Sequence, residues 1–318
     1  MSSEPREATD DAAWVIVPDG VGADLDRLAA CCHELVIAWF ETARGHAVLP
    51  GAGSPAAVDA KLFRRAKQTA PTNVEHGPGQ QAGLYVDAIG QQLLAMEALL
   101  RARRIAVALW PLIRAELELA GRVAWLLDPG IEPPAGEVRV ARLYLEVISS
   151  LQRDRYTAGR HDRAAEKRAK TVRDEKIAEA RQLFDRVEVD LSSPDSFGTW
   201  NIGGESILGL GDAVGAFIRL SFGGGSKALY DILSDYSHPS LTAIARQTMQ
   251  IEVDGVAMRP WRVDIDTADR QVHYACAILY KAAHFLAGYY ELDTAPLERW
   301  ADSVPSAWFS STGEASPS

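Results

Sequence analysis

The sequence predicts an all-α protein, a multi-helix bundle with long amphipathic helices and one short β-hairpin near residues 250–265. Three observations support this prediction. Apolar residues recur with a helical period of 3.6 along most of the chain, capping residues and prolines stand where helices would begin, and one segment alternates like a strand. The 318 residues, 47% of them hydrophobic, can bury a core without a disulfide or a metal.

The first part of the chain carries most of the helical pattern. Helices are predicted over residues 25–42, 55–68, 80–109, 111–127, 136–158 and 162–188. Asp24 is placed to cap the first of these helices, and Ser54 with Pro55 supplies an N-cap and a first-turn proline for the second. Pro111 is expected to begin a helix, because inside one it would remove a hydrogen bond.

The last part of the chain mixes a loop, helices and the hairpin. Serine, glycine and proline dominate residues 192–204, which predicts a loop. Further helices are predicted over residues 205–221, 226–237, 267–290 and 295–302. Apolar and polar residues alternate from Ile251 to Ile265, and the pair Asp254-Gly255 is typical of a hairpin turn.

We expect a single helical domain over residues 21–304, with a sub-boundary near 190–204 and disordered tails at 1–20 and 305–318. The first residues are acidic and polar, and they lack the basic start and apolar core of a secretory signal. The longest apolar run, Ile105 to Ile113, is too short to span a bilayer. A chain without a membrane segment is therefore expected.

Charge and cysteine usage narrow the class of protein. The net charge is −10, from 33 Lys and Arg against 43 Asp and Glu, which disfavours duplex DNA or an anionic membrane as the main partner. Cys31, Cys32 and Cys276 form neither a CxxC pair nor an even-numbered disulfide framework. We therefore expect a reduced, cytoplasmic location.

Some patterns resemble binding motifs but lack the context that their chemistry requires. Residues 209–215 approximate a dinucleotide-binding loop without a preceding strand, and residues 223–227 lack the spacing of a phosphate loop. Nine basic and five acidic side chains interleave over residues 153–176, which indicates a solvated helix face. No cofactor is predicted. The mobility of the glycine-rich segments 203–204 and 223–225 is left open.

A polar stripe follows the last long helix. Its members recur at steps of 4, 3, 4 and 4 residues and so share one face: Asp269, His273, Cys276, Tyr280 and His284. The stripe is interpreted either as the wall of a small-molecule enzyme's pocket or as a partly solvated seam. No metal site is predicted, because His273 and His284 lie three turns apart and HExxH spacing is absent.

A second polar face lies on the helix predicted over 111–127. Arg114, Glu118 and Arg122 recur every four residues, so two arginines flank one carboxylate. If this face is buried, its charges need partners, and the polar residues of segment 234–238 could supply them. The candidate site residues are therefore Arg114, Glu118, Ser234 and His238.

Three short segments carry a resemblance to known proteins. They are PLIR at 111–114 with Glu118, WLLDP at 125–129, and YDILSDYSHP at 230–239. Over roughly residues 80–290 the chain resembles a group of uncharacterised bacterial helical proteins, which are loosely similar to the HEPN-like helical domains of RNA-cleaving toxins and phage-defence proteins. The resemblance implies a helical bundle in which the four candidate residues lie near one another.

Three functions stay open. HEPN ribonucleases carry an arginine followed by four to six residues and a histidine, which act together on the scissile phosphate, and no arginine stands at that spacing before His238. A non-enzymatic module in a defence or stress system is therefore favoured, with a protein or small-molecule partner and a homodimer as one arrangement. The alternatives are a metal-independent ribonuclease that joins His238 to Arg114 on RNA, and a small-molecule enzyme built on the stripe from Asp269 to His284.

Overall fold

The computed structural model describes most of the chain. The described residues are 15–16, 20–43, 50–105, 109–131, 135–192, 196–223, 230, 233, 248, 250–253, 256–258, 261–262 and 264–305. Helices dominate them, so the predicted all-α class is confirmed. No helix among these residues is long and apolar enough to cross a lipid bilayer.

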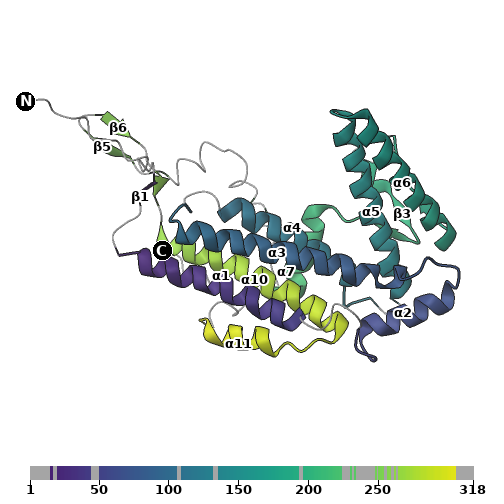
Figure 1. Ribbon diagram of the computed structural model, residues 1–318, viewed down its shortest axis with the longest axis horizontal. Coiled ribbons are helices and arrows are strands. Elements are labelled where there is room, and N and C mark those ends of the chain that lie inside the picture. Colours follow the sequence, from purple (N-terminus) through teal and green to yellow (C-terminus); the bar gives the residue numbers. More distant parts are fainter. Residues whose placement is uncertain are drawn as a thin grey trace, which may run out of the picture.

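Long helices from both ends of the chain form the central bundle. They are α1 (Gly22–Ala43), α3 (Gly77–Arg101), α4 (Leu109–Leu127) and α10 (Ile265–Tyr290). In Figure 1, α1, α3 and α10 run side by side, and α4 packs against both α3 and α10. α7 (Leu210–Phe222) packs against α4, and α11 (Ala295–Ser303) packs against α1.

The helical period explains which faces meet in this core. In α1 the apolar residues that recur every three or four positions are buried, including Leu25, Cys32 and Trp39. α4 and α10 are buried over most of their surface, because neighbouring helices cover them on several sides. The bundle is therefore built around these two helices.

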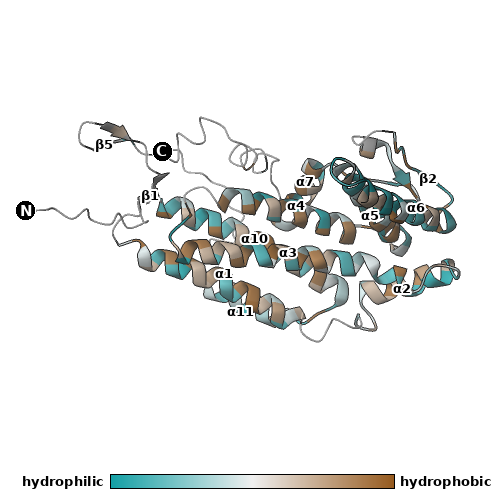
Figure 2. Cartoon of the chain, turned by 45° about the horizontal axis from the view of Figure 1, so that its top comes forward, coloured by the Kyte–Doolittle hydropathy of each residue, from teal (hydrophilic) through white to brown (hydrophobic). Residues whose placement is uncertain are grey.

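The other helices form a projecting arm and its base. α2 (Pro55–Ala66) begins at the predicted N-cap, where the hydroxyl of Ser54 accepts a hydrogen bond from the N–H of Ala57. α5 (Gly136–Gly159) and α6 (Arg163–Leu183) pack together as a helical hairpin, the arm, which stands out from the bundle (Figure 1). Figure 2 shows that hydrophilic residues cover much of the arm. A 3-10 helix, Val74–His76, links α2 to α3.

A small sheet at the base of the arm corrects the loop predicted over residues 192–204. An antiparallel sheet is formed by β2 (Val187–Glu188), β3 (Asn201–Ile202) and β4 (Glu205–Ser206), and a 3-10 helix (Ser196–Thr199) lies between β2 and β3. Gly203 and Gly204 turn the chain between β3 and β4 with φ angles of 61° and 93°, which glycine adopts without strain. Trp200 is fully buried and fixes the segment to the core.

The predicted hairpin is confirmed by the pairing of its two strands. β5 (Ile251–Val253) pairs with β6 (Val256–Met258) in antiparallel register. It is shorter than predicted, because β7 (Trp261–Arg262) pairs instead with β1 (Val15–Ile16), in parallel. β1 is thus a strand inside a segment expected to be disordered. Most other residues of the two predicted tails lie outside the described chain.

Some helix boundaries differ from the prediction for local reasons. α3 ends early at Arg101, and the left-handed φ of 57° at Arg103 marks the break. α4 begins at Leu109, so Pro111 lies in its first turn, where the missing N–H costs no hydrogen bond. α6 ends at Leu183, because the residues that follow extend into β2.

Two helices in the last part of the chain begin at other residues than predicted. α7 begins at Leu210, because β4 occupies the start of the predicted helix. α10 is capped by Asp264, slightly earlier than expected. The helix predicted over 226–237 lies outside the described residues, apart from Tyr230 and Leu233.

Candidate functional site

A cavity of about 690 Å³ lies at one end of the bundle. Its wall is formed by the C-terminal ends of α4, α7 and α10, by α2 and by the start of α5. Most of this wall is apolar, with contributions from Val58, Leu127, Leu220 and Phe285. A volume of this size, lined by apolar side chains and a few polar groups, is typical of sites for small molecules.

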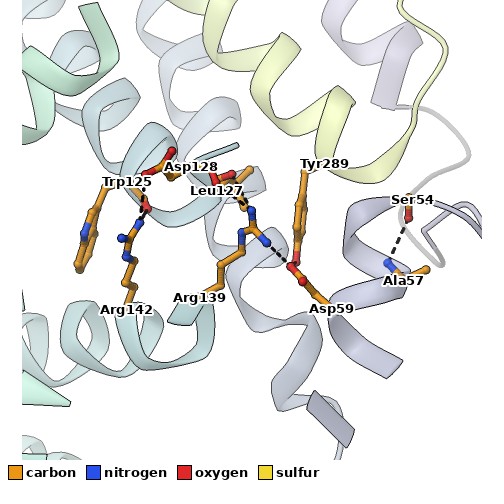
Figure 3. A network of polar contacts seen from close by, with 9 residues as sticks. All are labelled: Ser54, Ala57, Asp59, Trp125, Leu127, Asp128, Arg139, Arg142 and Tyr289. Atoms are coloured by element: carbon orange, nitrogen blue, oxygen red, sulfur yellow. Dashed lines mark hydrogen bonds and ion pairs between the residues drawn. The ribbon is translucent and has the colours of Figure 1, made fainter. Parts of the chain in front are cut away.

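Three polar side chains in the wall, Asp59, Arg139 and Tyr289, contact one another (Figure 3). We name them the paired cluster. Arg139 forms an ion pair with Asp59 and donates from Nη2 to the carbonyl oxygens of Leu127, at 3.3 Å, and Asp128, at 2.9 Å. The ring of Tyr289 lies 5.1 Å from the guanidinium carbon, and its hydroxyl donates to Asp59 over 3.4 Å. The cluster ties α2, α5 and α10 to the end of α4.

Burial and pairing set the charge of the paired cluster. The side chains of Arg139 and Asp59 are only 5% and 6% exposed. Burial raises the pKa of the Asp59 carboxyl, and the contacts with Arg139 and Tyr289 offset only part of this effect. Burial also raises the pKa of the Tyr289 phenol, which stays neutral. The charges of Asp59 and Arg139 therefore compensate each other inside the wall.

A glycine brings the two charged residues together. Gly136, in the first turn of α5, lies against the backbone of α2, and a Cβ atom there would be 2.7 Å from the carbonyl oxygen of Asp59. Only a residue without a side chain permits this approach. Arg139 follows one helical turn later on α5, which places its side chain beside Asp59.

A second group of polar side chains lies in the same wall on α7 and α10, and we name it the unpaired cluster (Ser221, Lys281 and His284). Within the described chain, the hydroxyl of Ser221 and Nε2 of His284 are buried without a hydrogen-bond partner. The ammonium of Lys281 lies 5.9 Å from the centre of the Phe222 ring and 5.8 Å from that of Tyr280. It forms no ion pair with any residue that the structure describes.

His284 adds no charge to the unpaired cluster at neutral pH. Burial lowers the pKa of its imidazole, and the positive charge of Lys281, one turn earlier on α10, lowers it further, while the carboxylate of Glu298 offsets only part of this effect. The imidazole ring lies 4.4 Å from the ring of Tyr280, measured between ring centres. The net charge of the cluster therefore comes from Lys281.

The polar stripe predicted on the last long helix does not line one pocket. Asp269 lies 3.5 Å from Arg27 of α1, and Cys276 is fully buried, with a hydrogen bond to the thiol of Cys32. All members of the stripe are described, and of these only His284 lines the cavity. The interpretation of the whole stripe as a pocket wall is therefore corrected to a contribution from one residue.

The structure brings Arg114 and Glu118 together with Tyr230. Nε of Arg114 and the hydroxyl of Tyr230 both donate to Oε1 of Glu118, each over 3.1 Å. The guanidinium carbon of Arg114 lies 5.5 Å from the centre of the Tyr230 ring, and these contacts raise the pKa of Arg114. Ser234 and His238 lie outside the described residues, so their position near this cluster stays a prediction.

Arg122, on the same helix, has a different partner. It forms an ion pair with Glu146 of α5, and the hydroxyl of Tyr85 donates to that carboxylate over 2.8 Å. The predicted network, in which two arginines share the carboxylate of Glu118, is therefore replaced by two separate ion pairs. Arg114 keeps Glu118, whereas Arg122 connects α4 to the arm.

The basic segment at residues 153–176 forms the outer part of the arm. Most of its Lys and Arg side chains are exposed, as expected for a solvated helix face. Arg155 lies 3.5 Å from Glu166, which adds an ion pair between α5 and α6. Arg173 departs from the prediction, because it is buried and donates a hydrogen bond to Gln152.

The sequence alone does not reveal the cavity, because its polar residues come from four helices. Asp59 and Arg139 are 80 positions apart in the chain. One signal was present: Asp59 lies on the buried face of α2 between Ala56 and Phe63, in the helical period. A charged residue in an apolar position indicates a buried partner. Lys281 carried no comparable signal.

No group of three or more His, Cys, Asp or Glu side chains within the described ranges could hold a metal ion. No protein-family model matches the chain, and comparisons with curated proteins and with solved structures found no significant similarity. The class of protein therefore follows from its own geometry. It is a helical bundle with a largely apolar cavity at one end.

Proposed function

We propose that this protein binds a small organic molecule in the cavity at the end of the bundle. The observation that carries the proposal is the cavity itself, about 690 Å³ in volume, apolar over most of its wall and polar at two clusters. In sites for small molecules the apolar wall supplies affinity, and a few polar groups fix the orientation of the ligand.

The energetics of the wall favour an occupied cavity. The cavity opens to solvent, and apolar lining residues such as Val58 and Leu220 are 41% and 42% exposed. An apolar ligand would remove this surface from water, which favours binding. Ser221 and His284 each leave a buried polar atom without a partner in the described chain, and a ligand that bonds to these side chains removes that cost.

A neutral aromatic probe tests the proposal. N-phenyl-1-naphthylamine fluoresces strongly in apolar surroundings, and we expect saturable binding to the purified protein. The variants Gly288→Phe and Gly215→Phe form a matched pair. Both glycines are in helices, and an added Cβ meets no atom within 4 Å at either one. Only Gly288 lines the cavity.

Gly288→Phe is expected to weaken binding of this probe by at least about tenfold, since its ring occupies the cavity, whereas Gly215→Phe leaves the affinity within about twofold. Far-ultraviolet circular dichroism checks that both variants keep their helices. If the wild-type protein gives no saturable signal, or if Gly288→Phe binds as well as the wild type, the proposal is wrong.

A metal-independent ribonuclease is the second candidate function. Tyr230, which begins the segment that contains Ser234 and His238, contacts both Arg114 and Glu118. This contact supports a site that includes the histidine and the arginine. The test is cleavage of single-stranded RNA in the presence of EDTA by the wild type and by His238→Ala. Cleavage by the wild type alone supports the candidate, and no cleavage eliminates it.

Without RNA cleavage, the favoured function is that of a non-enzymatic module that binds its ligand in the bacterial cytoplasm. A role in a defence or stress system then rests on the resemblance to HEPN-like proteins. A homodimer is the assembly to test first. Light scattering during size-exclusion chromatography, with and without the probe, measures the mass in solution.

A further inference from the structure

We infer that the ligand is an amphipathic organic anion, whose apolar body fills the cavity and whose single anionic group pairs with Lys281. This inference rests on the proposed function and specifies the chemistry of the molecule that is bound. It follows from the charges of the cavity wall, from the surroundings of Lys281 and from the shape of the remaining wall.

The charges of the wall leave one cation without a counterion in the described chain. Asp59 and Arg139 pair with each other, so their charges cancel. His284 is neutral at neutral pH. Lys281 lines the same cavity, lies close to two aromatic rings and forms no ion pair with a residue that the structure describes. A cation beside an apolar cavity favours a ligand that carries a negative charge.

The surroundings of Lys281 can hold an anionic oxygen. The rings of Phe222 and Tyr280 lie 5.9 Å and 5.8 Å from its ammonium, close enough to attract and help orient the charge. Ser221, next to Phe222 on α7, supplies a hydroxyl that can donate. His284, one turn after Lys281, supplies a neutral ring nitrogen that can donate from one tautomer.

The rest of the wall selects against highly charged ligands. Beyond the two clusters it consists of apolar side chains such as Val58, Leu127 and Phe285. A second negative charge placed against these side chains would lose contact with water without gaining a partner, which costs free energy. A monoanion such as a carboxylate or a sulfonate on an aromatic or aliphatic body therefore fits better than a nucleotide or another polyanion.

Two probes with the same aromatic body test the inference. 8-Anilino-1-naphthalenesulfonate differs from N-phenyl-1-naphthylamine by one sulfonate group. We expect the wild-type protein to bind the sulfonate about tenfold more tightly than the neutral molecule. One charge-assisted hydrogen bond in a partly buried site increases affinity by about this factor. Fluorescence titration of both probes gives this preference directly.

Variants of Lys281 assign the preference to its charge. Lys281→Met is expected to reduce the preference, measured as the ratio of the two affinities, to within about twofold, and Lys281→Arg is expected to keep it. Lys61→Met is the control, because Lys61 is exposed on α2 and does not line the cavity. It removes the same charge and is expected to leave the preference intact.

The outcomes separate this inference from the proposed function. Equal binding of both probes by the wild type, or a preference that survives in Lys281→Met, overturns the inference while the neutral probe still supports a small-molecule site. Binding of neither probe overturns both. If Lys281→Met loses helical structure, Lys281→Arg is compared with the wild type instead. Lys281→Arg keeps the positive charge, so loss of the preference for the sulfonate in Lys281→Arg would contradict a role for the charge.

Discussion

Glu116 lies fully buried on α4 in the middle of the bundle. Neither of its carboxyl oxygens has a hydrogen-bond partner among the described residues, and burial raises the pKa of the group well above its ordinary value. Burial therefore favours its protonated form, because an unpaired buried charge costs far more than a neutral acid. Even as a neutral acid, this side chain lowers the stability of the fold.

Glu116→Leu is expected to raise the free energy of unfolding by about 1 to 3 kcal/mol, because it removes an unsatisfied polar group from an apolar site. The gain should grow with pH. The folded state holds the proton of Glu116 more tightly than the unfolded chain, so wild-type stability is lost as pH rises from the ordinary carboxyl range towards the raised pKa of the folded state.

Urea denaturation in a mildly acidic and in a mildly alkaline buffer measures both effects. Glu34→Leu, at an exposed position on α1, is the control and is expected to change stability little at either pH. A Glu116→Leu variant that is less stable than the wild type in both buffers would contradict the assignment of an unsatisfied buried acid.

The ion pair of the paired cluster gives another prediction about single residues. Arg139→Met leaves the carboxylate of Asp59 buried without its cation, and it is expected to lower the free energy of unfolding by about 3 to 5 kcal/mol. Adding Asp59→Leu to this variant should recover part of the loss, because no uncompensated charge remains. Chemical denaturation of both single variants and the double variant measures the coupling, and strictly additive losses would show that the two side chains do not interact.

The crossing of α4 and α7 depends on a glycine. A Cβ atom at Gly121 would lie 2.9 Å from the backbone of both Ala213 and Val214, so the two helices would have to move apart. Gly215, on α7, has no neighbouring atom within 4 Å of an added Cβ. The two glycines therefore differ in the space around them although both belong to the same pair of helices.

These two glycines predict changes of opposite sign. Gly121→Ala is expected to lower the free energy of unfolding by about 1 to 3 kcal/mol. The added methyl group would collide with backbone atoms of α7, which cannot move aside as the end of a flexible side chain can. Gly215→Ala is expected to raise it by about 0.5 to 1 kcal/mol, since alanine favours the helix. Urea denaturation of both variants checks the signs, and stabilisation by Gly121→Ala would contradict the close crossing.

The helices could be predicted because their signals are local. Apolar periodicity and capping residues act within one or two turns, and they located the helices of the bundle and of the arm to within a few residues at most of their ends. The sheet at the base of the arm could not be found in this way. Its strands have two residues each, too few to show an alternating pattern. The burial of Trp200, which fixes these strands to the core, depends on the tertiary fold.

The candidate site depends on the whole molecule, and this limited its prediction. Arg114 and Glu118 lie one turn apart on a single helix, so their pairing followed from spacing alone. Lys281 and Asp59 line the same cavity only because α2 and α10 lie close together at one end of the bundle. No local pattern encodes such convergence, although a charged residue on the buried face of α2 was a usable sign.

Burial is uneven across the molecule, and this predicts uneven local stability. α10 is buried on most sides by α1, α3 and α4, whereas α6 packs mainly against α5 and leaves most of its surface in solvent. Local opening costs less where fewer apolar contacts must break. We therefore expect the backbone amides of α6 to exchange with deuterium faster than those of α10.

Ile177→Ala tests whether the arm opens separately from the bundle. Ile177 is one of the few buried apolar side chains of α6, and its truncation is expected to weaken packing in the arm by about 2 to 5 kcal/mol. Hydrogen exchange measured by mass spectrometry should then rise in α6 and stay unchanged in α10, so that the cavity wall formed by α10 keeps its shape while the arm opens. A parallel rise in both helices would show that arm and bundle unfold as one unit, and that the binding site cannot persist without the arm.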